Sequence, residues 1–328
     1  MPSSMTHTYF GIDVYNNLNK QCQNKIKNSL EYFKFFAQGS DPFMFYGFFL
    51  GKKAKQVSNI QSKMHSSNTR IFFLTTINYI NDNKLNNNED VMAYLYGYIC
   101  HYYLDLYTHP FIYYKSGIFD KNNKNTYKYN GIHQQIEYAI DLYFIAKNEK
   151  INPREFKVYK AIYDIEKFTP ELRNIIKATI DDVYLNNLAS YYYEKAIWYM
   201  KTFFRLANYD PYGSKLKIYK FIDSITPKNI IRLRELSFSN VYDNINDYLN
   251  LDNKVWYCPW DNSKVYKASF LELYERAKKD AIKTIEEVTK MLDSNSLNKD
   301  KLTDIFKDLS FTTGINCNKK VDFRYFEF

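Results

Sequence analysis

The chain has 328 residues, of which 45% are hydrophobic and 25% charged, with only 9 glycines and 8 prolines. These proportions exclude collagen-like, linker-like and wholly disordered chains. Because a sheet-rich fold needs many tight turns, the scarcity of glycine and proline predicts an all-α fold. The formal net charge of +9 predicts a surface that attracts the phosphates of lipids, nucleotides or nucleic acid, although a basic protein without such a partner is the simpler interpretation.

The first half of the chain shows apolar residues at helical spacing. A helix is expected from about Tyr15 to Phe36, followed by a short polar loop at residues 38–42. A second helix is expected over Asn68–Ile80, before an asparagine-rich interruption.

A strongly apolar helix is expected to begin at Glu89 and reach about Thr108, where Pro110 would end regular helix. The polar residues 115–130 predict a loop, and apolar spacing predicts another helix over residues 132–147.

Helix starts are signalled repeatedly in the second half. Three sites place a capping residue before a first-turn proline: Asn152-Pro153, Thr169-Pro170 and Thr226-Pro227. The capping box formed by Ser269 and Glu272 predicts a long helix toward Met291.

No linker rich in proline, glycine or serine and no fixed-period repeat divides the chain, which predicts a single domain over residues 1–328. Residues 1–150 are expected to hold the candidate ligands, residues 151–310 to pack around them as helices, and residues 311–328 to form a surface tail. Residues 252–267 predict a surface connector, with a loop over the mouth of a cleft as the alternative.

Neither a targeting signal nor paired cysteines are evident. No apolar stretch reaches the roughly 18–20 residues of a membrane span, and the start lacks a basic end followed by an apolar run. Cys22, Cys100, Cys258 and Cys317 are far apart in the sequence. We therefore expect no disulfide framework, no thiolate zinc site and a cytoplasmic location.

All five histidines lie in the first 133 residues: His7, His65, His101, His109 and His133. His101 and Asp105 are four residues apart in the apolar helix, so they share one face, and His109 continues that stripe one turn later. His133 and Glu137 repeat the spacing on the next expected helix.

A single His-x3-Asp pair is ordinary on a helix, but the combination is not. Buried polar groups need partners, and a packed core has no reason to collect carboxylates with its imidazoles. Magnesium and calcium prefer all-oxygen shells, so the mixed nitrogen and oxygen donors favour zinc. The sequence therefore predicts a site for more than one zinc ion.

Five segments resemble the bacterial zinc-dependent phospholipase C family, in its cytoplasmic branch rather than its secreted toxins. They are MPSSMTH at 1–7, QGSDP at 38–42, Met64-His65, ICHYYLDLYTHP at 99–110, and His133 with Glu137. Trp256-x2-Pro259 followed by Ser269-Phe270 is also similar to that branch. The resemblance implies an all-α domain that holds up to three zinc ions in a cleft and cleaves a phosphodiester.

The resemblance also implies a ligand set for each ion. The first zinc would be bound by His65, His101 and Asp105, and the second by His109, His133 and Glu137. A third would be bound by His7 and Asp105, with Asp105 as the bridge. Asp41 occupies the place of the family's proposed general base, which would accept a proton from zinc-activated water, or of the carboxylate that orients that water.

One departure concerns the third zinc. The secreted enzymes begin with a tryptophan whose amine and carbonyl complete that site, whereas this chain begins Met1-Pro2. We therefore expect two firmly bound zinc ions and a third that is weak or absent.

The resulting hypothesis is a zinc-dependent phosphodiester hydrolase, similar to phospholipase C, that acts on a phospholipid or another phosphodiester and contacts an anionic membrane surface peripherally. One alternative is a zinc nuclease acting on single-stranded nucleic acid, although no motif favours it. Another is a metal-stabilised binding protein without turnover. Phe43, Phe45 and Tyr46 are interpreted as core residues, with a substrate pocket as the alternative.

Overall fold

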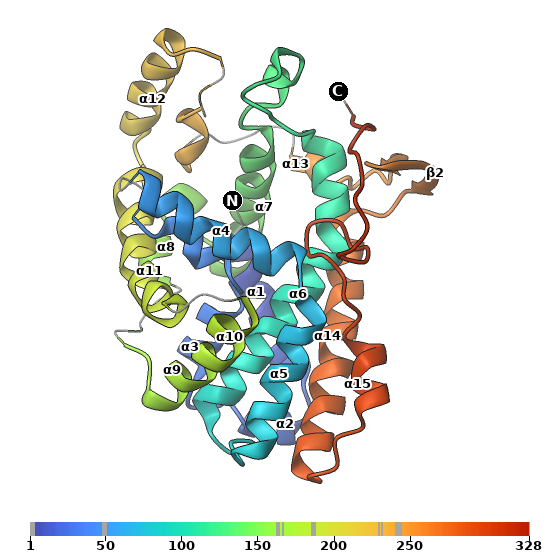
Figure 1. Ribbon diagram of the computed structural model, residues 1–328. Helices are drawn as coiled ribbons and strands as arrows, with labels where there is room; N and C mark the ends of the chain where they lie inside the picture. Colours follow the sequence, from blue (N-terminus) through green and yellow to red (C-terminus); the bar gives the residue numbers. More distant parts are fainter. Residues whose placement is uncertain are drawn as a thin grey trace.

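A computed structural model describes residues 4–47, 51–161, 165, 167–184, 188–228, 230, 232–239 and 245–327. These residues are mostly helical and include one small antiparallel sheet (Figure 1). The predicted all-α fold is therefore confirmed.

The elements of the first half are helices of the α and 3-10 (η) types. They are α1 (Ser4–Asn17), α2 (Lys20–Asn24), α3 (Leu30–Phe36), η1 (Asp41–Phe45), α4 (Lys52–Ser66), α5 (Thr69–Asp82), α6 (Glu89–Ser116), η2 (Lys124–Tyr129) and α7 (Ile132–Glu149).

The second half adds shorter helices, two π-helical turns (η4 and η5), a hairpin and one long helix. They are η3 (Pro153–Glu155), α8 (Val158–Ala161), α9 (Pro170–Ile176), η4 (Lys177–Asp181), α10 (Asp182–Tyr184), α11 (Ala189–Phe203), η5 (Phe204–Asn208), α12 (Ser214–Ile225), η6 (Arg234–Leu236), α13 (Ile245–Tyr248), β1 (Trp256–Cys258), β2 (Asp261–Tyr266), α14 (Phe270–Asp293) and α15 (Lys299–Ile305).

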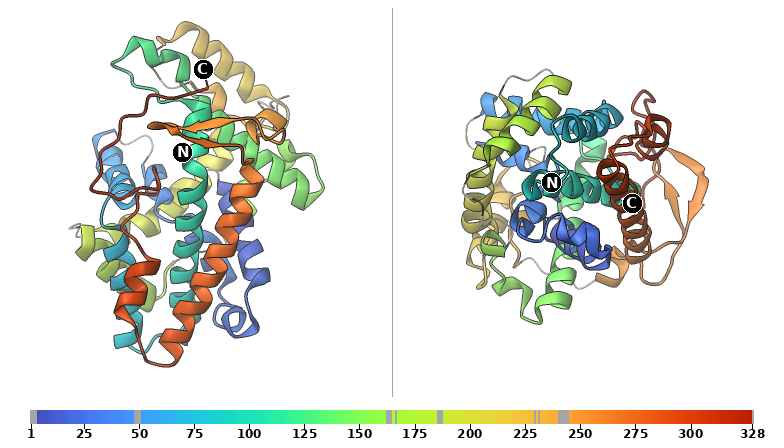
Figure 2. Two further views of the ribbon diagram at one scale, coloured as in Figure 1. Left: turned by 90° about the vertical axis from the view of Figure 1, so that its right-hand side faces the viewer. Right: turned by 90° about the horizontal axis from the view of Figure 1, so that it is seen from below.

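The apolar helix α6 is the centre of the fold. It packs along α14 and also contacts α1, α3 and α7, so it is enclosed on several sides (Figure 2). The side chains from Val91 to Leu104 are all buried. One hydrophobic core extends from Met5 to Phe311, and none of the described helices is long and apolar enough to cross a membrane.

Pro110 lies inside α6, so the prediction that it ends the helix is wrong. A proline removes one helical hydrogen bond, but Phe111 and Ile112 directly after it are buried, and this packing continues the helix. The helix ends at Gly117, whose φ of 62° is left-handed.

The expected helix from Tyr15 to Phe36 is three helices instead. The side chain of Asn19 accepts a hydrogen bond from the amide of Cys22, which ends one helix and begins the next. Leu18, Cys22 and Ile26 are all buried. The apolar spacing therefore persists across the breaks, and spacing alone does not reveal them.

The predicted helix starts had mixed outcomes. Thr169 caps α9, and the capping box at Ser269 opens α14, as predicted. Asn152 caps only the short η3. Thr226 ends α12 with extended backbone, and no helix starts there in the described part.

Two predicted connectors contain regular structure. Residues 115–130 include the end of α6 and the 3-10 helix η2, and residues 252–267 form the β1–β2 hairpin. Trp256 anchors this hairpin in the core, 3% exposed, with its indole donating to the carbonyl of Ala268. The division into domains stays a prediction.

Candidate metal centre

Four helices and one 3-10 turn contribute the predicted site residues, and the structure brings all of them to one place. His7 comes from α1 and Asp41 from η1. His65 comes from the last turn of α4. The stripe His101, Asp105 and His109 comes from α6, and the pair His133 and Glu137 from α7. Because α1, α6 and α7 pack against one another in pairs, these side chains meet in the interior.

The predicted first ligand set has the spacing of a zinc site. The Nε2 atoms of His65 and His101 are 3.4 Å apart, and each lies 3.3 Å from Oδ2 of Asp105. Tetrahedral zinc with bonds of about 2.0–2.1 Å holds its ligand atoms roughly 3.3–3.4 Å apart. The three atoms therefore form one face of a zinc-sized tetrahedron.

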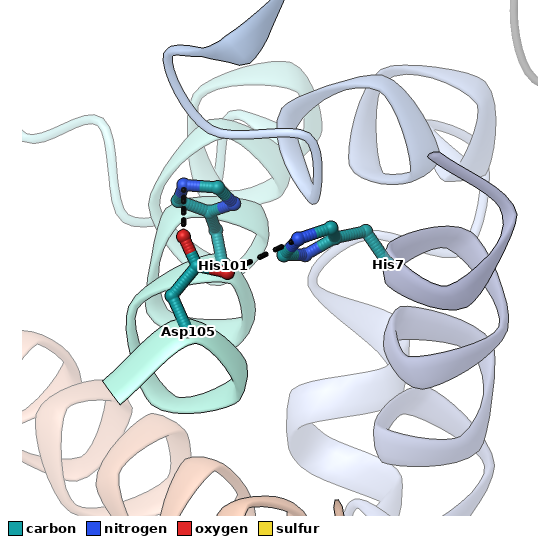
Figure 3. Close-up of side chains that lie close together, drawn as sticks. All are labelled: His7, His101 and Asp105. Atoms are coloured by element: carbon teal, nitrogen blue, oxygen red, sulfur yellow. Dashed lines mark ion pairs between the residues drawn. The ribbon is translucent and has the colours of Figure 1, made fainter. Parts of the chain in front are cut away.

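Asp105 also reaches the predicted third set through its other oxygen. The Nε2 atom of His7 is 3.2 Å from Oδ1 of Asp105, and both imidazoles in Figure 3 point at this carboxylate. Asp141 on α7 accepts hydrogen bonds from the backbone amides of Met5 and Thr6, at 3.2 and 2.7 Å, and so fixes the first turn of α1. Asp105 thus lies between two groups of imidazoles.

The predicted second set lies on the other side of Asp105. Ligand atoms of His109, His133 and Glu137 all lie within 4.8 Å of one another, and His133 Nε2 is 3.1 Å from Oε1 of Glu137. His109 Nδ1 is also 3.7 Å from Oδ2 of Asp105, so the two sets are continuous.

Several buried polar atoms at the centre have no hydrogen-bond partner in the described part of the chain. They are His7 Nδ1, Asp41 Oδ2, His101 Nδ1 and Asp105 Oδ2. Burying such atoms unpaired is unfavourable. Imidazole nitrogens and carboxylate oxygens together are donors that suit zinc. These residues therefore fit the metal that the sequence predicts.

Hydrogen bonds from outside the centre orient three of the imidazoles. His65 Nδ1 lies 3.0 Å from Ser40 Oγ, His109 Nδ1 lies 2.7 Å from the carbonyl of Phe311, and His133 Nδ1 lies 3.3 Å from Ser116 Oγ. In each case Nε2 is the nitrogen left to bind a metal, an arrangement common around zinc ligands.

Phe311 belongs to the site although the sequence placed it in a surface tail. It is 3% exposed, its amide donates to the carbonyl of His65 at 2.8 Å, and its ring contacts those of His65 and His101 edge-on. The prediction that a surface tail begins at Phe311 is therefore wrong. No periodicity surrounds Phe311, so the sequence carried no signal of this long-range contact.

Gly39 lets the loop before Asp41 pass directly over His101. Its φ is 54°, and a Cβ at this position would lie 2.1 Å from Cδ2 of His101. Only glycine combines that backbone with such close approach. The carbonyl of Gly39 accepts a hydrogen bond from the hydroxyl of Tyr193, which holds the loop.

Asp41 is 1% exposed and lies beside the first ligand set. Its Oδ1 accepts a hydrogen bond from Gln61 Nε2 at 3.1 Å and lies 3.3 Å from His65 Nε2. Burial raises the pKa of Asp41 to about 6, against the opposing charge of His65. For Asp105 the surrounding imidazoles outweigh burial and hold its pKa well below the usual range. The two carboxyl groups therefore differ in how readily they bind a proton.

The imidazoles fall into two electrostatic groups. Burial lowers the pKa of His101 and of His109, which favours the neutral form that binds metals. Burial acts in the same direction on His7 and His65, but neighbouring carboxylates outweigh it and raise their pKa. Protons and metal ions therefore compete most strongly at His7 and His65.

A cleft of about 380 Å³ lies over the centre. Its lining residues in the described part of the chain are Asp41, Met44, Gln61, Ser62, His65, Ser66, His109, Tyr113, His133, Glu137 and Thr312. None of them is lysine or arginine, so the histidines are the lining side chains that can carry positive charge. Phe43, Phe45 and Tyr46 are buried, as their interpretation as core residues predicted.

Comparison with known families finds one match to the residues that build this centre. The family model described as zinc-dependent phospholipase C matches residues 6–206, a range that includes every site residue predicted from the sequence. No curated protein and no solved structure matches the chain.

Proposed function

Because the chain belongs to the zinc-dependent phospholipase C family, we propose that it hydrolyses the phosphodiester bond of a phospholipid head group in the cleft over the metal centre. The observation that carries the proposal is the spacing of 3.3–3.4 Å among His65 Nε2, His101 Nε2 and Asp105 Oδ2. That spacing fits one zinc ion, and Oδ2 of Asp105 is buried without a hydrogen-bond partner among the described residues.

The proposed ligand sets follow the sequence prediction. His65, His101 and Asp105 would hold one zinc, and His109, His133 and Glu137 a second. His7 and Asp105 would contribute to a third, weaker site. Residues 1–3, which precede α1 and His7, lie outside the described residues.

Zinc bound at these residues would supply a water of lowered pKa and positive charge for the phosphoryl oxygens. The chain's own contribution is to place a proton acceptor beside it. Asp41 lies against the first ligand set and lines the cleft, and Gln61 donates to its Oδ1. We assign Oδ2, which has no hydrogen-bond partner in the part of the chain that the structure describes, as the atom that accepts the proton.

Two substitutions separate the base from the ligands. Asp41→Ala is expected to keep zinc and fold but to lower the rate at least about 10²-fold, the usual contribution of a general base. Asp105→Ala is expected to change the zinc content, because a ligand is lost. Equal activity of Asp41→Ala and the parent would remove Asp41 from the mechanism, and unchanged zinc stoichiometry in Asp105→Ala would argue against the bridge.

The substrate class is tested by assaying the zinc-loaded protein on three phosphodiesters. These are short-chain phosphatidylcholine, bis-p-nitrophenyl phosphate and single-stranded DNA. The proposal expects release of the phosphorylated head group from the lipid. Cleavage of DNA with the lipid untouched would favour a nuclease, and zinc binding without turnover on any of the three would favour a binding protein.

A further inference from the structure

Helix α12 (Ser214–Ile225) presents an apolar stripe to solvent. Ile218, Phe221 and Ile225 are 58%, 66% and 69% exposed. Their spacing of three and four residues places them on one face of the helix. Large apolar side chains exposed singly are ordinary, but a contiguous row of three on one helix marks an interaction surface.

The opposite side of α12 is firmly attached, so the stripe belongs to an ordered element. Asp223 is 3% exposed and accepts hydrogen bonds from the amides of Leu233 and Arg234, at 2.8 and 3.1 Å, and from Nε of Arg234 at 2.8 Å. The hydroxyl of Tyr219 donates to the carbonyl of Ala207 at 3.1 Å. These hydrogen bonds attach one side of α12 to the protein, so the apolar stripe on the other side faces solvent.

The exposed charges that α12 and the described residues flanking it in the sequence carry near the stripe have one sign. Lys217, Lys220 and Lys228 are exposed. The acidic residues of the described part between 209 and 239 are all buried: Asp210, Asp223 and Glu235. A surface that combines apolar side chains with lysines alone is complementary to anionic lipid, because the long lysine side chains reach the head groups while the apolar groups enter the boundary layer.

We propose that α12 lies in the surface of an anionic bilayer and docks the protein on the membrane that holds its substrate. This role rests on the proposed phospholipid hydrolysis. A second copy of the chain is a poorer occupant, since an interface of the same face with itself would bring the lysines of both copies together.

The docking surface is linked to the metal centre through the start of α7. The side chain of Asn130 donates to the carbonyls of Lys228 and Ile230, at 2.9 and 2.6 Å, and His133 follows three residues later. In Figure 1, α12 and the start of α7 lie at the same end of the molecule. A bilayer at α12 therefore lies at the end of the molecule from which α7 carries His133 and Glu137 into the centre.

The test is flotation with vesicles of phosphatidylcholine, with and without phosphatidylglycerol. The Asp41→Ala protein is the parent for every variant, so that lipid is not consumed and binding does not depend on hydrolysis. The first variant adds I218S, F221S and I225S, and the second adds K217Q and K220Q. The control adds I71S, because Ile71 is an exposed isoleucine on α5, 48% exposed. Circular dichroism and thermal melting verify that each variant is folded.

The parent is expected to bind the anionic vesicles more tightly than the neutral ones. The serine variant should bind at least about tenfold more weakly, since three apolar side chains no longer leave water. The glutamine variant should lose about fivefold per lysine, about 25-fold in all. The control should bind like the parent.

Anionic vesicle binding that is unchanged in both α12 variants would overturn the proposal. The proposal would also be overturned if the parent did not bind vesicles but formed a dimer in light scattering, and if the serine substitutions dissociated that dimer. With Asp41 intact, the serine variant should hydrolyse dissolved short-chain phosphatidylcholine at the rate of the unsubstituted protein. Absence of that hydrolysis in the unsubstituted protein would reject the phospholipase proposal, and the vesicle result would then be judged by itself.

Discussion

Gly39 holds the loop before Asp41 against the ring of His101, and Gly39→Ala tests whether this contact maintains the metal centre. The added Cβ would lie 2.1 Å from Cδ2 and 2.4 Å from Cγ of His101. Carbon atoms in ordinary contact are about 3.5–4.0 Å apart, so the loop and the ring must separate by roughly 1.5 Å. Metal–ligand distances vary by only about 0.2 Å in a good site.

Two effects of this substitution have different sizes. The left-handed backbone at Gly39 costs a residue with a side chain about 1–2 kcal/mol, which lowers stability without moving His101. The displacement of the ring is the larger effect, because a shift of about 1 Å in a catalytic site lowers the rate by about 10²-fold. We expect Gly39→Ala to lose zinc from the first ligand set and at least about 10²-fold in activity.

Gly51→Ala is the matched control. Gly51 has a φ of 56°, nearly that of Gly39, but nothing in the described structure lies within 4 Å of a Cβ placed there. It therefore carries the backbone cost without the contact. Zinc content, hydrolysis of short-chain phosphatidylcholine and melting temperature are measured for both. If Gly39→Ala matches Gly51→Ala in zinc content and rate, the contact with His101 does not position the centre.

Three further predictions follow from the same geometry. Phe311→Ala should lower the free energy of unfolding by about 3–5 kcal/mol, because its buried ring packs on His65 and His101. Unfolding in denaturant measures this loss. A loss below about 1 kcal/mol would contradict the prediction. The apparent zinc affinity should fall as the pH is lowered, since carboxylates raise the pKa of His7 and His65 and a protonated imidazole cannot bind zinc. Competition with a chromophoric chelator measures the affinity, and an affinity that does not change on acidification would refute it. Removing zinc should lower the melting temperature, and zinc but not magnesium should restore it.

The sequence determined the parts of the centre that depend on local geometry. A spacing of four residues places His101, Asp105 and His109 on one face of any helix, and the same holds for His133 and Glu137. The cap at Ser269 and the apolar run of α6 are likewise properties of neighbouring residues. These features were predictable because helix periodicity and capping act over a few residues.

Tertiary structure decided which distant groups meet. Phe311 reaches His65 and His109 from the far end of the chain, and packing carries α6 through Pro110. Long-range packing likewise leaves the apolar stripe of α12 exposed to solvent. Periodicity shows that a helix has an apolar face but not what that face contacts, since this depends on long-range packing that leaves no local pattern.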